Sequence, residues 1–347
     1  KTRVLTSRVA KIIKESPETT VLAVTFTNKA ALEIKERISK EYSDITTSNI
    51  WVGTFHSVCL RLLRAYPSVA PVKPGFTIAD DADCKNIIKN ILKDMDLSHE
   101  AADIKKYQAI ISSLKNNSYN DTGNSVKVIE IYNEYEKILE RSQCIDFDDI
   151  IVKALDMLKL DNGLADSLRQ KFNHVLVDEF QDTNISQYEV IKILGWKSQS
   201  ICVVGDFDQS IYSWRGGSPE ALSWFTNDFP KCKVVKLTKN YRSSSNIVNV
   251  CKSIIKDNYA PYRSDLVPTQ DDGEPISFNI YSTDLDEARK VIENYQNSHG
   301  SSAIIFRINA QSRLFELELV RRGRAYNMVG SLKFYERAEI KDIISYL

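Results

Sequence analysis

Residues 175–184 read VLVDEFQDTN, a branched apolar run that ends in two adjacent acids. Comparable apolar runs of strand length recur along the chain. They lie at 21–27 (VLAVTFT), 174–179 (HVLVDE), 200–206 (SICVVGD), 232–238 (CKVVKLT), 275–281 (PISFNIY) and 302–307 (SAIIFR). Because these runs are continuous and do not alternate with polar residues, they are typical of parallel strands covered by helices on both faces. The sequence therefore predicts an α/β fold.

Helical patterns lie between these runs. Residues 80 to about 170 show helical spacing with few β-branched runs, which predicts an inserted helical subdomain. Segment 309–325 (NAQSRLFELELVRRGRA) has Asn309 as a candidate N-cap and Gly323 at its end. Segment 28–42 (NKAALEIKERISKEY) predicts an amphipathic helix. The apolar residues that share one face of this helix are Ala31, Ile34 and Ile38.

Composition excludes several classes of protein. The six cysteines are scattered without a C-x-x-C pair, so neither a zinc site nor a disulfide framework is indicated. No apolar run approaches the roughly 18 to 20 residues that a membrane span needs, and the first residues resemble no signal peptide. We therefore expect a cytoplasmic protein without membrane partners. With 347 residues, of which 43% are hydrophobic, the chain is long enough for two or three folded units.

Charge is unevenly distributed although the formal net charge is zero. Residues 1–64 carry 11 basic and 6 acidic side chains, whereas residues 80–183 carry 13 basic and 21 acidic ones. A basic face could attract a polyanion. Ordinary solvated helix faces explain the same pattern, so charge alone does not identify a partner.

Polar residues follow several of the apolar runs. Asp178 and Glu179 end one run, Asp206 ends another and leads to Gln209, and a third leads to Arg242. In open α/β sheets, ligands bind at the carboxyl ends of the strands. An acidic pair at this place suits hydrolysis of a nucleoside triphosphate, with Asp178 holding Mg²⁺ and Glu179 orienting or deprotonating the attacking water. The alternative role for the pair is helix N-capping, which Asp182 or Thr183 could supply instead.

The first two residues fit the same chemistry. Lys1 and Thr2 match the end of the phosphate-binding pattern G-x-x-x-x-G-K-[ST]. In that pattern Lys1 reaches the β and γ phosphates and Thr2 is a ligand of Mg²⁺. Because the glycines of the pattern are not in this sequence, we expect the chain to be a fragment that hydrolyses ATP weakly or not at all by itself.

The sequence resembles the superfamily 1A DNA helicases of the UvrD, PcrA and Rep type over nearly its whole length. The segments that carry the resemblance are long and follow the family order of motifs Ia to IV. They are VTFTNKAALEIKERI (24–38), GTFHSVCLRLLR (53–64), VLVDEFQDTN (175–184), VVGDFDQSIYSWRGGSP (203–219) and LTKNYRSSSNIV (237–248). Residues 304–347 resemble the first part of the second motor domain of that family.

The resemblance implies two RecA-like domains of a P-loop ATPase. The first would comprise residues 1–79 and 146–231, with a helical subdomain inserted at 80–145. Residues 232–347 would begin the second domain. The chain departs from the family pattern because it ends before the inserted 2B domain and before motifs V and VI.

The resemblance also implies roles at the nucleotide, with ATP and Mg²⁺ as the bound groups. Gln209 would sense the γ phosphate, and Arg242 would supply a cation for the charge that develops during phosphoryl transfer. Tyr241 would stack on the adenine, and Arg3 would help to frame the nucleotide.

Aromatic residues in polar loops predict single-stranded DNA as the track. Tyr212 and Trp214 lie in a glycine-terminated stretch where large rings are difficult to bury, and bases offer faces on which they can stack. For Phe26 a place in the core is nearly as good an interpretation, and His56 could be a structural hydrogen-bonding residue. The full predicted DNA set is Phe26, Thr27, Asn28, Thr54, His56, Tyr212, Trp214 and Arg215.

The resulting functional prediction is an ATP-driven translocase on single-stranded DNA that separates duplexes. Its 3′ to 5′ polarity, its action at single-strand/duplex junctions and its place in repair, replication or recombination, with repair or replication proteins as partners, are implied by the resemblance. Two alternatives stay open. The chain could be a noncatalytic module that binds single strands, or the helicase part of a helicase-nuclease.

Overall fold

The computed structural model describes residues 1–41, 49–116, 126–196, 198–211, 217–218, 220–258, 263–296, 300–329 and 343. The chain divides into two compact units, which are described separately. The first consists of Lys1–Lys239 and Cys251–Val267, and the second of Asn240–Val250 and Pro268–Leu347. None of the helices in the described ranges is long and apolar enough to cross a membrane.

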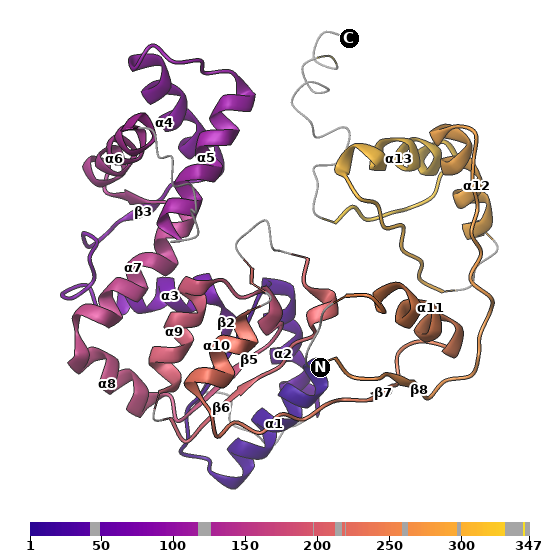
Figure 1. Cartoon of the computed structure of the whole chain (residues 1–347), viewed down its shortest axis with the longest axis horizontal. Helices are drawn as coiled ribbons and strands as arrows, with labels where there is room; N and C mark the ends of the chain where they lie inside the picture. Colours follow the sequence, from indigo (N-terminus) through magenta and orange to yellow (C-terminus); the bar gives the residue numbers. More distant parts are fainter. Residues whose placement is uncertain are drawn as a thin grey trace. The chain divides into compact units, whose positions relative to one another are not determined.

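A four-stranded parallel sheet forms the centre of the first unit (Figure 1), which confirms the predicted α/β fold. Its strand order is β2-β1-β5-β6. The strands are β1 (Val21–Thr25), β2 (Ile50–Thr54), β5 (His174–Val177) and β6 (Ser200–Val203). Three of them lie in predicted apolar runs, whereas β2 was not predicted. The two central strands, β1 and β5, are buried along almost their whole length, as a continuous apolar run requires.

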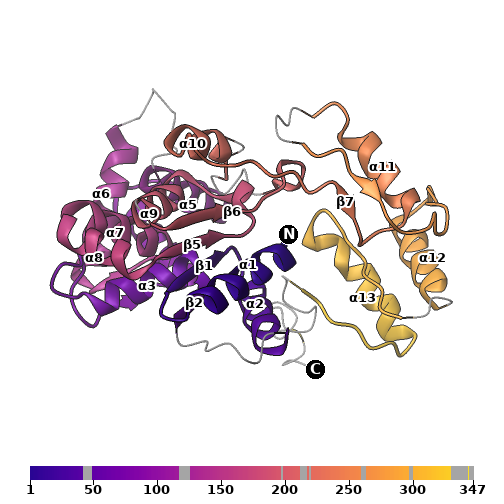
Figure 2. The same cartoon turned by 90° about the horizontal axis from the view of Figure 1, so that it is seen from below.

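Helices cover both faces of this sheet, and successive residues of β1 point to opposite layers. Val21 and Ala23 pack with α1 (Thr2–Glu15) and α2 (Asn28–Glu41), whereas Leu22 and Val24 face the other layer. Figure 2 shows α9 and α10 on one side of the sheet and α1 and α2 on the other. The helices of the second layer are α3 (Phe55–Ala65), α7 (Phe147–Leu160), α8 (Asn162–Lys171), α9 (Ile185–Gly195) and α10 (Ala221–Asp228).

The amphipathic helix predicted from segment 28–42 is α2. Ile34 and Ile38 are almost completely buried in the layer that α1 and α2 share, and Ala31 on the same helix is buried as well. The predicted common face is therefore confirmed.

Three helices form a separate apolar cluster beside the sheet (Figure 1, purple). They are α4 (Asp81–Asp94), α5 (Ala101–Lys115) and α6 (Val126–Arg141). Ile88, Leu92, Ile131 and Tyr135 are the centre of this cluster. A short parallel pair joins the cluster to the rest of the chain, formed by β3 (Thr77–Ile78) and β4 (Cys144–Ile145). The exact domain boundaries given above remain a prediction.

A buried lysine connects this helical cluster to α7. Lys115, at the end of α5, has a side chain that is only 1% exposed. Its Nζ lies 2.6 Å from Oε1 of Glu136, 2.8 Å from Oδ2 of Asp146 and 2.9 Å from Oδ2 of Asp149. Burial alone lowers the pKa of Lys115, but attraction to the three carboxylates outweighs it and raises that pKa. The lysine therefore stays charged at neutral pH.

The second unit contains the helical pair α12 (Asp284–Gln296) and α13 (Ser312–Arg321). The 3₁₀ turn η5 (Asn309–Gln311) precedes α13, and Gln311 is the residue at the N-cap position, so the predicted N-cap Asn309 is wrong. Gly323 does follow the end of α13, with a φ of +61° that favours glycine. Where the chain passes between the units lie helix α11 (Ser245–Ile255) and the short strands β7 (Lys239–Asn240) and β8 (Val267–Pro268).

The strands predicted at 232–238, 275–281 and 302–307 are wrong for this structure, because none of these segments adopts strand pairing. Their apolar side chains face solvent: Phe278 is 88% exposed and Ile305 is 93% exposed. A strand needs hydrogen-bonding neighbours and a covering layer, and the described chain brings neither to these runs.

We predict that Lys115→Met destabilises the chain by about 3 to 5 kcal/mol, because the buried Asp146 and Asp149 and the partly exposed Glu136 lose the cation that they share. Urea unfolding followed by circular dichroism measures this. The matched control is Lys137→Met, which removes an exposed ion pair to Glu134 on α6 and should cost less than about 1 kcal/mol. Equal effects of the two substitutions would contradict a structural role for the Lys115 cluster.

Candidate active site

Lys1 lies where two strand ends of the sheet meet the start of α1. Its Nζ is 2.5 Å from Oε2 of Glu179, which follows β5, and 3.2 Å from Oε1 of Gln209, which follows β6. These partners are 178 and 208 residues away in the chain. The parallel register explains the meeting, because β5 pairs with both β1 and β6 and all three strands end at the same edge.

Asp178 and Thr2 form a second contact at this edge. The Thr2 hydroxyl donates to Oδ2 of Asp178 at 3.3 Å, and the backbone N–H of Glu179 donates to the other carboxylate oxygen at 3.1 Å. Burial and the adjacent charge of Glu179 raise the pKa of Asp178. Asp178 is therefore a buried carboxylate that a bound cation would stabilise.

Glu179 has an unusual backbone conformation. Its φ of 49° and ψ of 45° are left-handed, which is uncommon for a residue other than glycine because its Cβ comes too close to the following carbonyl oxygen. This conformation turns the chain from β5 into the 3₁₀ turn η2 (Phe180–Asp182). Burial opposes ionisation of Glu179, but hydrogen bonds from Lys1 and Gln181 outweigh it and hold the pKa of this carboxyl below its usual value.

Gln181 joins the two strand ends. Its Nε2 donates to Oε2 of Glu179 at 2.9 Å and to Oδ2 of Asp182 at 3.2 Å, while its Oε1 accepts from the backbone of Asp206 at 2.9 Å. Gly205 makes room for this amide, because a Cβ at position 205 would lie 3.0 Å from Oε1 of Gln181. A side chain at position 205 would force Gln181 to shift by a few tenths of an ångström.

Asp206 positions Gln209. It caps the 3₁₀ turn η3 (Phe207–Gln209), accepting from the backbone of Asp208 at 3.2 Å through Oδ1 and from Nε2 of Gln209 at 2.5 Å through Oδ2. The Gln209 amide therefore bridges Asp206 and Lys1. Sequence reasoning did not assign Asp206 a role, although it was recognised as a strand-end acid.

The predicted helix cap after the acidic pair also needs correction. The N-cap of α9 is Asn184, whose Oδ1 accepts from the backbone of Gln187 at 2.8 Å. Neither Asp182 nor Thr183 caps this helix. Asp178 and Glu179 are likewise not used for capping it, so the structural alternative for the acidic pair does not hold.

The donor set at this edge fits a nucleotide with Mg²⁺. The N-terminus of α1, flanked by Lys1, is the kind of site that binds phosphate oxygens. A carboxylate and a hydroxyl, from Asp178 and Thr2, are the hard oxygen ligands that Mg²⁺ prefers, with phosphates and water completing its shell. Among the described residues no cluster of three or more His, Cys, Asp or Glu side chains could hold a metal ion by itself.

Other predicted residues lie at the same edge of the sheet but not in this network. Arg3 is exposed on the first turn of α1, and Phe26, directly after β1, is only partly buried. Thr27 accepts from the backbone of Ala30 at 3.1 Å, and Asn28 begins α2 in an exposed position. Thr54 is buried and caps α3, so its hydroxyl has a structural task.

His56 stacks on an aromatic residue that sequence reasoning missed. The rings of His56 and Phe147 have centroids 3.9 Å apart and an interplanar angle of 24°. Phe147 is the first residue of α7 and is 60% exposed. In the sequence, Phe147 stands between acidic residues in IDFDDI (145–150), where a large apolar side chain is unusual. That setting was the available signal for an exposed ring.

The structure does not place the remaining predicted residues at this edge of the sheet. Tyr212, Trp214 and Arg215 lie outside the described residues. Tyr241 and Arg242 belong to the second unit, where the ring of Tyr241 is largely exposed and the backbone of Arg242 donates to Oδ1 of Asn240 at 2.9 Å.

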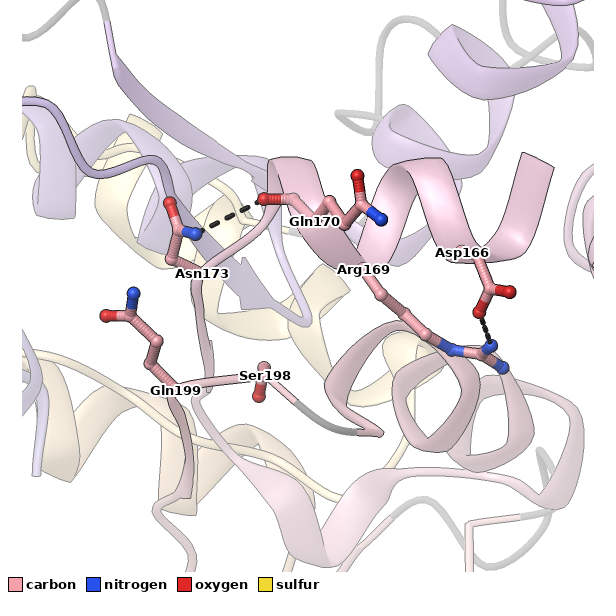
Figure 3. Close-up of a pocket in the computed structure, with 6 residues that line it drawn as sticks. All are labelled: Asp166, Arg169, Gln170, Asn173, Ser198 and Gln199. Atoms are coloured by element: carbon pink, nitrogen blue, oxygen red, sulfur yellow. Dashed lines mark hydrogen bonds and ion pairs between the residues drawn. The ribbon is translucent and has the colours of Figure 1, made fainter. Parts of the chain in front are cut away.

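A polar cavity of about 360 Å³ lies at the other end of the strands, before the starts of β5 and β6 (Figure 3). Its cation, Arg169, is already paired with Asp166 at 2.6 Å and donates to the carbonyl of Ile193 at 2.8 Å. Among its described lining residues, the cavity therefore offers no unpaired cation for a phosphate. It is lined by Asp166, Arg169, Gln170, Asn173, Ser198 and Gln199.

Two family models match this chain. Residues 1–230 match the UvrD/REP helicase N-terminal domain, and residues 235–347 match the UvrD-like helicase C-terminal domain. The boundary between the two matches lies close to the place where the chain passes between its compact units.

The chain is also similar to named helicases. It is 37% identical over 363 aligned positions to the ATP-dependent DNA helicase PcrA of Staphylococcus aureus strain Mu50, and 37% identical over 364 positions to PcrA of Staphylococcus epidermidis strain ATCC 12228. Each alignment covers 100% of this chain and 50% of the relative, so the chain spans about half the length of these relatives. With a family model matched over most of its length, the chain belongs to the UvrD/Rep family of ATP-dependent DNA helicases.

Proposed function

We propose that this chain forms the nucleotide-binding part of an ATP-driven motor that moves 3′ to 5′ along single-stranded DNA and separates duplexes at junctions. The observation that carries the proposal is the pair of contacts from Lys1 to Glu179 and Gln209. These contacts bring together Lys1 as the candidate phosphate-binding residue, Glu179 as the candidate base and Gln209 as the candidate γ-phosphate sensor. The relatives' names, which describe ATP-dependent DNA helicases, support the same activity.

In this proposal Lys1 moves from Glu179 to the phosphates of ATP. Thr2 and Asp178 would hold Mg²⁺, which when bound neutralises charge on the phosphates. Without its contact to Lys1, Glu179 loses the interaction that most lowers its pKa. The carboxylate then becomes a stronger base and can accept a proton from the attacking water.

Gln209 would report the presence of the γ phosphate. Its amide is held by Asp206 on one side and contacts Lys1 on the other, so movement of Lys1 changes the partners of Gln209. Gln181 would pass the same change between the two strand ends, because it contacts both Glu179 and the backbone of Asp206. From the second unit, Arg242 would meet the transition-state charge and Tyr241 the adenine, while Arg3 would frame the nucleotide.

For the DNA track we propose stacking on aromatic rings, with Phe147 added to the set predicted from sequence. One face of the Phe147 ring rests on His56, which holds the ring in place while the residue stays 60% exposed. Such stacking tolerates any base, as a motor on arbitrary sequence requires. The other proposed contacts are Phe26, Thr27, Asn28, Thr54, Tyr212, Trp214 and Arg215.

The direct test is ATP hydrolysis by the complete product of the reading frame, with and without single-stranded DNA. We expect strong stimulation by DNA and weak or no turnover by the 347-residue chain alone. Glu179→Gln should keep ATP binding but lower turnover by about a hundredfold or more, because the base is lost. Fluorescent ATP-analogue binding and phosphate release measure the two quantities.

The matched control is Glu189→Gln, which changes a carboxylate on α9 that pairs with Lys192 outside the network. It should leave turnover unchanged. Binding of DNA with no ATP turnover in the complete protein would reject the motor and favour the binding-module alternative. Unchanged turnover in Glu179→Gln would remove Glu179 from the role of base.

The proposed track predicts that Phe147→Ala weakens binding of single-stranded DNA by about 1 to 3 kcal/mol, the usual loss for one stacked base. Fluorescence anisotropy with a labelled oligothymidine measures this. Leu160→Ala is the control, since it removes an exposed apolar side chain from the other end of the same helix. Equal affinities of Phe147→Ala and the unchanged protein would exclude Phe147 from the track.

A further inference from the structure

An arginine far along the chain holds the turn that carries Gln209. Nε of Arg263 donates to Oδ2 of Asp208 at 2.8 Å, and Nη2 donates to Oδ1 at 2.7 Å. Each carboxylate oxygen thus has its own N–H donor, the bidentate geometry that fixes orientation as well as distance. The Asp208 side chain is only 11% exposed and that of Arg263 26%, so this is not a freely solvated surface pair.

The same guanidinium also holds the end of α11. Nη1 donates to the carbonyl of Lys256 at 3.3 Å, and Nη2 donates to the carbonyl of Asn258 at 2.7 Å. Lys256 directly follows Ile255, the last residue of α11, and Asn258 lies three residues beyond that end. Arg263 therefore connects the residues just after α11 to the segment after β6, and all of these residues belong to the first unit.

Asp208 is well placed to transmit a change at the nucleotide. It precedes Gln209 in turn η3, and its backbone N–H donates to the same Asp206 carboxylate that accepts from the Gln209 amide. A shift of Gln209 therefore changes the turn on which Asp208 is mounted. At its other end, α11 begins three residues after Arg242 and continues from the second unit into the first.

We propose that Arg263 is a positioning residue that couples turn η3 to helix α11, so that a change in the partners of Gln209 reaches the segment carrying Arg242. The inference rests on the proposed function, because it assigns a task within ATP hydrolysis. Arg263 does not touch the reacting atoms. Its guanidinium suits the task because it stays charged throughout and presents its donors in a rigid plane.

The coupling predicts a specific defect in Arg263→Met, which removes the charge but keeps an unbranched apolar side chain. In the complete product of the reading frame, turnover at saturating single-stranded DNA should fall about ten- to a hundredfold, the scale expected when a remote change misplaces catalytic groups. The KM for ATP and the turnover without DNA should change less than about twofold, because the Lys1 contacts stay intact. Arg263→Lys keeps the charge but not the two parallel bonds, so it should restore only part of the stimulated turnover.

Two comparisons separate coupling from a general loss of structure. Asp208→Asn should reproduce the defect, and the double variant Asp208→Asn/Arg263→Met should be no worse than either single variant, because both remove the same link. The control is Lys252→Met on α11, which breaks an exposed pair to Asp265 in the same part of the chain and should leave stimulated turnover unchanged.

The outcome for Arg263→Met separates failure of the coupling from failure of the motor. Stimulated turnover that is normal in Arg263→Met, or effects of the two single variants that multiply in the double variant, would overturn the inference while leaving the motor established. A parallel loss of stimulated turnover, unstimulated turnover and thermal stability would also overturn it, in favour of a purely structural role. An unchanged protein that hydrolyses no ATP would reject the proposed function and the inference with it.

Discussion

The parallel pairing of β5 between β1 and β6 brings the residues of the candidate active site together. Val177, the last residue of β5, is in register with Val24 on one side and Val203 on the other. The strands β1, β5 and β6 therefore all end at the same edge of the sheet. Asp178 and Glu179 are fixed there because β5 is buried and cannot slip without exposing its apolar side chains, and Gln209 joins them from the segment after the half-buried strand β6.

Lys1 and Lys115 both pair with carboxylates but differ in burial. This difference distinguishes a ligand-binding site from a structural contact. Lys115 is enclosed by three acids and is 1% exposed, so no ligand can reach it and its pairs fix α5 and α6 against α7. Lys1 and Glu179 retain side-chain exposures of 18% and 33%. Their ion pair can be exchanged for contacts to a ligand at small desolvation cost, which is what a phosphate-binding lysine requires.

Structural features that depend on local sequence pattern, or on the general geometry of parallel sheets, could be predicted from the sequence. β1, β5, β6 and α2 follow from apolar runs and helical spacing, and the meeting of strand-end residues follows from the parallel arrangement. The left-handed backbone of Glu179, the bridging amide of Gln181, the stack of His56 on Phe147 and the pair of Arg263 with Asp208 could not be predicted. Each depends on a contact or backbone turn set by the folded chain, with Arg263 and Asp208 55 residues apart. The apolar runs of the second unit were visible in the sequence but do not form strands. A run such as 275–281 forms a strand only where another strand pairs with it.

In the proposed reaction Lys1 exchanges Glu179 for a nucleotide phosphate. This exchange would be visible in a crystal structure of the complete reading-frame product with Mg²⁺, ADP and beryllium fluoride. We expect Nζ of Lys1 on the phosphate mimic, free of Glu179, with Thr2 and Asp178 directed at the metal ion. A nucleotide bound elsewhere, with the ion pair between Lys1 and Glu179 still intact, would contradict it.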